Sequence, residues 1–99
     1  MTISAEKTGT DVTLHIGGRL DTTTAPELEK VINAALAEDT KDLTLDMAEI
    51  TCISSAGLRV LLGAQKKLDK IGSMKLTCVC EAVLEVLEIT GFADILKIV

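Results

Sequence analysis

The spacing of apolar residues restricts the fold of this chain more than any other feature of its sequence. Apolar and polar residues alternate in three segments, as in strands with one buried face, and these segments cover residues 12–16, 43–47 and 74–80. Apolar residues recur every three or four positions in three others, which indicates amphipathic helices over residues 23–37, 55–69 and 81–89. Further strands are predicted over Ile3–Lys7 and Ile95–Val99. The predicted order is β-β-α-β-α-β-α-β.

This order predicts an α/β fold. Strands that alternate with helices are joined by crossover connections, which favour parallel pairing. A parallel sheet covered on both faces has nearly continuous apolar strands, whereas these strands alternate. We therefore predict a single domain over residues 1–99, with a four- to five-stranded mixed sheet, helices mainly on one face and the other face partly in water.

Composition and charge exclude several classes of function. The chain has 99 residues, the size of one domain. Its single aromatic residue, Phe92, argues against modules that stack bases on rings, and its net charge of −5 would repel a phosphate backbone. No apolar run approaches the length of about 20 residues that a helix needs to cross a bilayer, and no signal peptide is recognised. We expect a cytoplasmic protein that binds neither nucleic acid nor membrane. We also expect a monomer, because the strand and helix stripes use the apolar positions.

The three cysteines do not suggest a metal site. Cys78 and Cys80 form a C-x-C pair, which lacks the usual spacing of structural zinc ligands, and His15 is the only histidine. Both cysteines are predicted on the apolar side of a strand, with Cys52 in a loop. We expect buried free thiols in a reducing compartment, and neither a metal nor a cofactor.

The segment from Asp46 to Leu58 is the most informative for function. We predict that a strand ends near Met47, that a helix begins near Ser55, and that the loop between them delivers the hydroxyls of Ser54 and Ser55 to the helix start. Helix N-termini expose unpaired N–H groups and the positive end of the helix dipole. A serine there can cap the helix, and it can also carry a phosphate that the N–H groups help to hold.

A second strand-to-helix connection runs from Gly18 to Leu28. Thr24 is a candidate N-cap, and Glu27, three residues later, would complete a capping box; Asp21 also suits capping. If the two strands are neighbours, both connections open at the same edge of the sheet. Two adjacent helix starts would then form one compact polar surface.

Catalysis is not supported by the sequence. A serine nucleophile would need a base, but His15 lies on a strand, and no G-x-S-x-G elbow surrounds the serines. No phosphate-binding glycine loop is present either. Asp46 and Glu49 are interpreted as a solvated strand end rather than as a carboxylate pair. We predict no catalytic residues and no enzyme activity.

Four motifs in this order resemble the STAS domain, and most of all the small anti-sigma factor antagonists (anti-anti-sigma factors) of bacteria. The resemblance spans nearly the whole chain and rests on Gly18-Arg19-Leu20-Asp21 with Thr24, on Leu43-Thr44-Leu45-Asp46-Met47, on Ile53-Ser54-Ser55-Ala56-Gly57-Leu58, and on Gly91-Phe92 followed by Ile95.

This resemblance implies a regulatory role by partner switching. Such antagonists bind an anti-sigma factor that is also a serine kinase, and binding releases the sigma factor for transcription. The kinase then phosphorylates a serine at the helix start, the antagonist dissociates, and a PP2C-type phosphatase restores the active form. Alignment on Gly57 places Ser55 at the phosphoacceptor, with Ser54 where many members have aspartate. The resemblance implies a partner-binding surface of Asp21, Thr24, Ser54, Ser55, Ala56, Gly57 and Leu58.

One alternative uses the same fold. The chain would be a STAS adaptor subunit of a transport complex that works without phosphorylation. In that case the Ser55 hydroxyl would have only a capping role.

Overall fold

A computed structural model describes all 99 residues and has an α/β fold. Four strands form one sheet: β1 (Thr2–Thr8), β2 (Asp11–Leu20), β3 (Asp42–Ile53) and β4 (Ser73–Thr77). The helices are α1 (Ala25–Ala37), α2 (Ser55–Ile71) and α3 (Glu81–Ile89), and a 3₁₀ turn, η1, covers Phe92–Asp94. All three helices lie where the apolar spacing predicts them.

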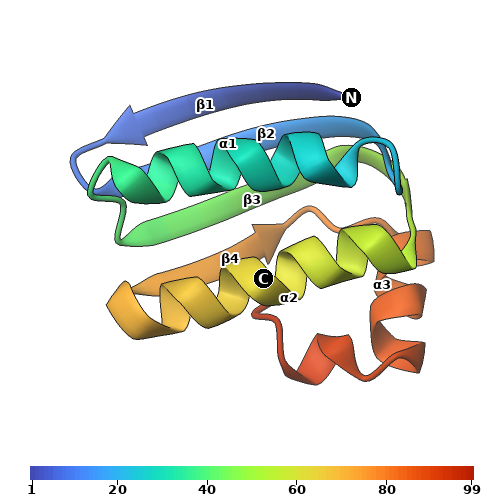
Figure 1. Ribbon diagram of the computed structural model, residues 1–99. Helices are drawn as coiled ribbons and strands as arrows, with labels where there is room; N and C mark the ends of the chain where they lie inside the picture. The colour runs from blue at the N-terminus through green and yellow to red at the C-terminus, as the bar shows by residue number, and fades with distance from the viewer.

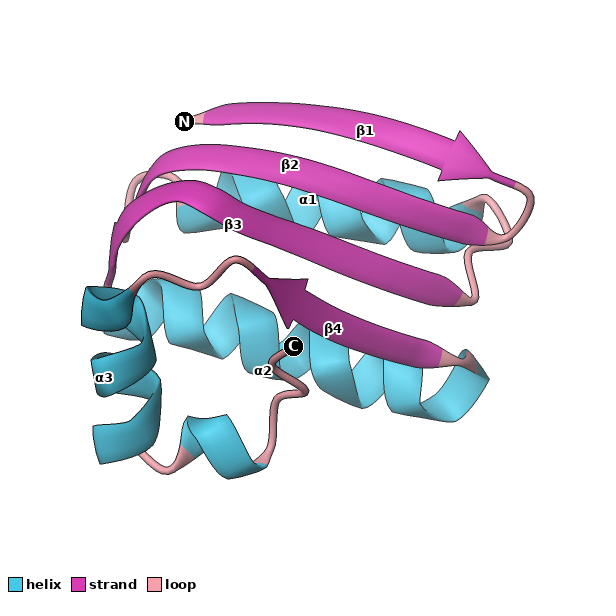
Figure 2. Ribbon diagram, turned by 180° about the vertical axis from the view of Figure 1, so that it is seen from behind, coloured by secondary structure: helices cyan, strands magenta, loops and turns pink.

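The sheet is mixed, with the strand order β1-β2-β3-β4. β1 runs antiparallel to β2, whereas β3 is parallel to both of its neighbours. α1 and α2 lie side by side on one face, and the opposite face carries no helix (Figures 1 and 2). α3 lies at the end of the sheet where β3 leads into α2 (Figure 2). No helix combines the length and the apolar composition that crossing a membrane requires.

The core lies between the sheet and the two helices. The strands supply alternate residues that are buried, namely Val12, Leu14, Ile16, Leu43, Leu45, Met47, Met74 and Leu76. Leu28 of α1 and Leu61 and Leu68 of α2 are fully buried as well. Thr13 and Thr44 are only half-buried on the opposite face. This asymmetry confirms that the alternating strands cover one core face and leave the other in contact with water.

The predicted fifth strand over Ile95–Val99 is wrong. Gly91, with φ of 82°, turns the chain into η1, and the residues after it meet β4 only at an isolated parallel bridge between Leu76 and Ile98. Leu76 N donates to Lys97 O at 2.8 Å, and Val99 N donates to Leu76 O at 2.9 Å. The apolar residues of this segment therefore provide one buried anchor, Leu96, rather than a strand.

The cysteines differ from the prediction because β4 ends at Thr77. Cys78 adopts φ of 57°, which stops the strand and turns its side chain into solvent. Cys80 lies at the N-cap of α3, and Cys52 lies within β3 rather than in a loop; both are half-buried. All three thiols are free, but none is fully buried.

Some apolar positions are not used by the core. The side chains of Ile71, Ile89, Ile95 and Val99 are all exposed, with Ile89 reaching 77%. The strand and helix stripes therefore do not use every apolar position, so the expectation that led to a monomer is wrong. The monomeric state itself stays a prediction.

We predict that the cysteines are dispensable for function, so that replacing them costs some stability but leaves partner binding intact. Replacing all three by alanine should lower the free energy of unfolding by less than about 2 kcal/mol, because none of the three is fully buried. Urea unfolding of the triple variant measures the loss. A larger loss of stability would contradict this interpretation. So would a metal ion that co-purifies with the wild-type protein and is absent from the triple variant.

Candidate functional site

Parallel pairing of β2 and β3 brings the starts of α1 and α2 together. Leu20 at the end of β2 pairs with Ile53 at the end of β3. The next residue, Ser54, donates its backbone N–H to Leu20 O at 2.9 Å. The two helices consequently begin at the same edge of the sheet (Figure 1). This confirms the expected juxtaposition of the two connections.

The two serines at the start of α2 have different surroundings. Ser54 is the N-cap with an extended backbone, and its Oγ is buried without a hydrogen-bond partner. Ser55 is the first residue of α2 and is exposed. Neither hydroxyl caps the helix, because Ser54, the N-cap, makes no side-chain hydrogen bond to it. Ser55 alone of the pair offers its hydroxyl to an approaching protein.

The loop predicted before Ser55 does not exist, because β3 continues to Ile53. The register of β3 against β2 shifts twice. The first shift lies between Asp46 and Glu49, and the second lies just before Cys52. At each shift β3 holds one extra residue, which is a β-bulge. Bulges bend a strand and re-aim the residues that follow. The bulged end of β3 leaves Ser54 as the single residue between strand and helix.

Asp21 and Thr24 organise the start of α1. Asp21 Oδ1 accepts the backbone N–H groups of Thr23 at 3.0 Å and Thr24 at 3.1 Å. Thr24 Oγ1 accepts from Asp21 N at 2.9 Å and donates to Arg19 O at 2.6 Å. The N–H of Thr24, more than any other group, lowers the pKa of Asp21, although desolvation opposes the shift. The turn therefore holds an ionised carboxylate of the half-buried Asp21 at the start of α1.

The capping box predicted for α1 does not form. Thr24 is the N-cap, but its side chain makes no hydrogen bond to the helix. The hydroxyl is occupied by the turn contacts with Asp21 and Arg19.

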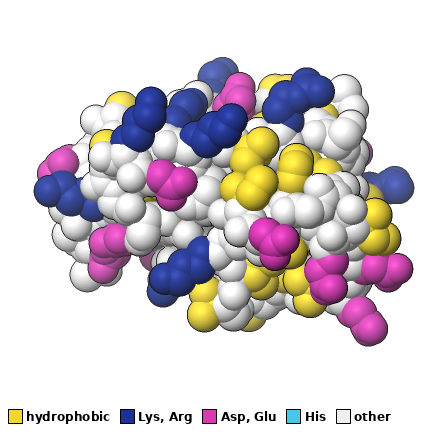
Figure 3. All heavy atoms as spheres, turned by 90° about the horizontal axis from the view of Figure 1, so that it is seen from below, with side chains coloured by type: hydrophobic (Ala, Val, Ile, Leu, Met, Phe, Trp, Pro, Cys, Tyr) yellow, Lys and Arg dark blue, Asp and Glu magenta, His cyan; other side chains and the backbone are white.

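Two shallow hollows flank the start of α2. One, of about 340 Å³, lies against α1 and includes Thr22, Pro26 and Ala56. The other, of about 380 Å³, is lined by Ser55, Leu58, Arg59, Leu62, Thr90 and Phe92. On the lower side of the molecule, hydrophobic side chains gather between Lys and Arg side chains on one side and Asp and Glu side chains on the other (Figure 3). Ser55 lines one of these two hollows together with the apolar side chains of Leu58, Leu62 and Phe92.

Comparison with known proteins decides the family. Residues 2–99 match the profile of the STAS domain. The chain belongs to the STAS domain family. It is 33% identical over 98 residues to the anti-sigma-B factor antagonist of Bacillus subtilis (strain 168), covering 97% of this chain and 88% of that protein.

Solved structures extend this similarity. An anti-sigma factor antagonist from Mycobacterium paratuberculosis matches with a TM-score of 0.88 and 25% identity, over 98% of this chain and 83% of that one. A sulfate transporter family protein from Wolinella succinogenes shares the fold, with a TM-score of 0.79 and 22% identity over 92% of this chain and 77% of that one. These relatives are named for antagonism of an anti-sigma factor and not for a catalysed reaction, which agrees with the prediction that this STAS domain is not an enzyme.

Within this STAS domain, the predicted partner-binding residues have unequal access to a partner. Ser55 is exposed and Ala56 is half-buried, whereas Gly57 and Leu58 are buried. An added Cβ at Gly57 would lie 2.7 Å from Leu20 Cγ and 2.9 Å from Leu20 O. Gly57 therefore allows α2 to approach the end of β2 closely, which positions the two residues before it.

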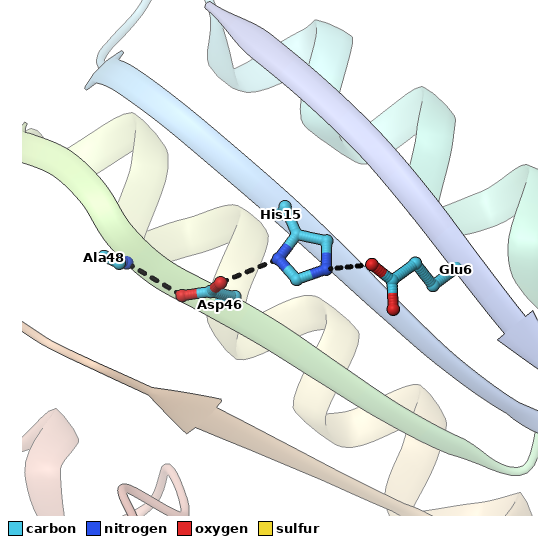
Figure 4. A network of polar contacts seen from close by, with 4 residues as sticks. All are labelled: Glu6, His15, Asp46 and Ala48. Atoms are coloured by element: carbon cyan, nitrogen blue, oxygen red, sulfur yellow. Dashed lines mark hydrogen bonds and ion pairs between the residues drawn. The ribbon is translucent and has the colours of Figure 1, made fainter.

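Sequence reasoning missed one polar cluster of this STAS domain. Asp46 is not at a solvated strand end; it lies inside β3, and its Oδ2 is 2.7 Å from His15 Nδ1. Glu6 of β1 reaches the other ring nitrogen (Figure 4). Both His15 and Asp46 occupy polar positions of alternating strands, but their contact depends on the register between β2 and β3.

Proposed function

We propose that this STAS domain is a cytoplasmic anti-sigma factor antagonist that acts by partner switching. In its unphosphorylated form it binds an anti-sigma factor with serine kinase activity, which frees a sigma factor. Phosphorylation of Ser55 ends the binding, and a PP2C-type phosphatase restores it. The observation that carries this proposal is the exposed Ser55 at the first position of α2, in a chain 33% identical to an anti-sigma-B factor antagonist.

The different environments of the two serines support Ser55 as the phosphoacceptor. A kinase must bring the γ-phosphate of ATP in line with an accessible hydroxyl. Ser54 Oγ is buried, and its phosphorylation would require the strand-to-helix junction to open. The exposed side chain of Ser55 needs no such opening.

The start of α2 also suits a phosphate electrostatically. A phosphate adds about −1.5 to −2 charges at neutral pH, and helix N-termini stabilise negative charge. The first turn of α2 contains no acidic residue that would oppose it. The phosphorylated domain should therefore stay folded while its contact surface changes charge.

The proposed contact surface combines both helix starts. Ser55 and Ala56 would touch the anti-sigma factor, and Asp21 and Thr24 would hold the adjoining turn in shape. Ser54, Gly57 and Leu58 would support this surface from beneath, since Gly57 and Leu58 are buried and the Ser54 hydroxyl is enclosed. The domain of residues 1–99 would act as a monomer that offers one such surface.

Intact-mass measurement after co-expression with candidate anti-sigma factor kinases from the same genome tests the proposal. We expect one phosphate on the wild-type chain, one on Ser54→Ala, and none on Ser55→Ala. Ser54→Ala is the matched control, because it removes the neighbouring hydroxyl but leaves Ser55. Phosphate on Ser55→Ala but not on Ser54→Ala would move the acceptor to Ser54.

The similarity to a sulfate transporter family protein favours one second candidate, a STAS adaptor subunit of a transport complex. An adaptor would bind its transporter irrespective of phosphate at Ser55. If no candidate kinase modifies the chain and a permease subunit co-purifies with it, the adaptor role replaces the antagonist role.

A further inference from the structure

A histidine between two carboxylates links three strands on the helix-free face of the sheet. His15, near the middle of β2, is half-buried. Its Nδ1 lies 2.7 Å from Asp46 Oδ2 on β3, and its Nε2 lies 3.1 Å from Glu6 Oε1 on β1. The imidazole lies between the two acidic side chains and points each ring nitrogen at one of them (Figure 4).

This geometry specifies a protonation state. An ionised carboxylate only accepts hydrogen bonds, whereas a neutral imidazole carries a single N–H. His15 can donate to Asp46 and Glu6 together only as the doubly protonated imidazolium. The hydrogen bond to Asp46 is the largest cause that raises the pKa of His15 above its ordinary 6.5; desolvation opposes the rise and Glu6 adds to it.

Asp46 connects the histidine to the first bulge of β3. While Oδ2 accepts from His15, Oδ1 accepts the backbone N–H of Ala48 at 3.0 Å. Ala48 lies at the extra-residue position between the pairs His15–Asp46 and Gly17–Glu49. Asp46 thus accepts the backbone N–H of Ala48 at the point where the hydrogen-bond ladder between β2 and β3 is interrupted. The N–H of Ala48 is also the main reason that the pKa of Asp46 is lowered.

We propose that Glu6, His15 and Asp46 form a pH-responsive clamp that holds edge strand β1 and the β3 bulge in place while His15 is doubly protonated. The clamp goes beyond partner switching and does not depend on it. Its relevance to the site is structural, because the bulged part of β3 runs directly into Ser54 and Ser55.

The surroundings of His15 are acidic and open to water. Its hollow, of about 280 Å³, is lined by residues of β1, β2 and β3, among them Asp46 and Glu49. On the neighbouring strand β4, the uncharged Thr77 pairs with Asp46. The cation Lys75 of the same strand pairs with Thr44, two residues before Asp46. No helix covers this face (Figure 2). Loss of the imidazolium proton therefore leaves three carboxylates, those of Glu6, Asp46 and Glu49, around a neutral ring.

The direction of the pH response follows from the two pKa shifts. A raised histidine pKa contributes stability that is complete below the unfolded value of 6.5 and disappears as pH rises through the folded value. A lowered aspartate pKa contributes stability that disappears as pH falls through the folded value, which lies below 3.8. The clamp is accordingly closed between the folded pKa of Asp46 and the folded pKa of His15. Starting from neutral pH, it opens as the pH rises and His15 loses its proton.

Nuclear magnetic resonance of the full chain tests the clamp between about pH 5 and about pH 9. The His15 ring resonances should titrate above pH 6.5 and show protons on both nitrogens below that point. Amide protection factors, corrected for the intrinsic pH dependence of exchange, should fall about two- to fivefold for Ala48 and for β1 through the same titration.

Three variants separate the contacts. His15→Gln should make these protection factors independent of pH. Glu6→Ala removes the acceptor for the Nε2 proton, so it should abolish the response of β1 but keep that of Ala48. Glu49→Gln is the matched control, because it removes one charge of the hollow without touching the ring, and both responses should persist. The proposal is overturned if His15 titrates at or below 6.5, if wild-type protection does not change through its titration, or if His15→Gln shows the same change.

Discussion

Phosphorylation of Ser55 is expected to weaken binding to the anti-sigma factor roughly a thousandfold, which corresponds to about 4 kcal/mol. The phosphate would place about two negative charges at the centre of the contact surface, and like-charge or unpaired charge in an interface costs several kcal/mol. Ser55→Asp carries one charge without the phosphate oxygens, so it should lose at least roughly tenfold in affinity. Isothermal titration calorimetry against the purified kinase measures both.

Ser55→Ala is the decisive comparison. It removes the acceptor but contributes no charge, and the Ser54 N-cap already makes no side-chain hydrogen bond to the helix. Ser55→Ala should therefore fold with a loss of no more than about 1 kcal/mol and bind the kinase constitutively. Ser54→Asp places the same negative charge one residue earlier and is therefore the control for the position of the charge in Ser55→Asp. If Ser55→Asp binds as tightly as wild type while Ser55→Ala still escapes phosphorylation, the phosphate acts through something other than charge in the interface.

Gly57→Ala is expected to lower the free energy of unfolding by about 1–3 kcal/mol. The added Cβ would lie within 3.0 Å of both the side chain and the backbone oxygen of Leu20, and a backbone atom cannot move aside as a flexible side chain can. Relief requires the start of α2 to move away from β2, which also displaces Ser54 and Ser55. The loss exceeds the gain of up to about 1 kcal/mol that alanine brings to a helix.

Gly63→Ala is the matched control on the same helix. An added Cβ at Gly63 meets no atom within 4 Å, so the substitution should stabilise the domain by up to about 1 kcal/mol through helix propensity alone. Urea unfolding of both variants measures the difference. Equal stability changes at the two glycines would show that the close approach to Leu20 is not restrictive, and Gly57 would lose its role in positioning the serines.

The periodicity of the sequence was sufficient to predict the elements of the fold. Burial on one face of a strand or helix is a local property, so period two marked β2 and the start of β3, and a period near 3.6 marked α1, α2 and α3. The prediction of one wet sheet face followed from the same alternation. The motifs around Asp21 and Ser55 added the family, since their order along the chain is also a property of the sequence alone.

The same periodicity failed wherever the backbone left its regular geometry. Each bulge in β3 adds one residue, which interrupts the alternation after Met47 and made the end of the strand resemble a loop. At Cys78, a left-handed φ ended β4 although the apolar alternation continued through Cys80. An extra residue shifts the phase of the alternation, whereas a change of φ turns the chain and leaves the alternation in the sequence unchanged.

The sequence alone determined the fold class, the position of the helices and the presence of two hydroxyls at the start of α2. Only the tertiary structure decided that Ser54 Oγ is enclosed while Ser55 is exposed, and that His15 meets Asp46 and Glu6. Both outcomes depend on the register between neighbouring strands, which is settled by non-local pairing. A one-residue slip would keep every local pattern of the chain and still bring different side chains together.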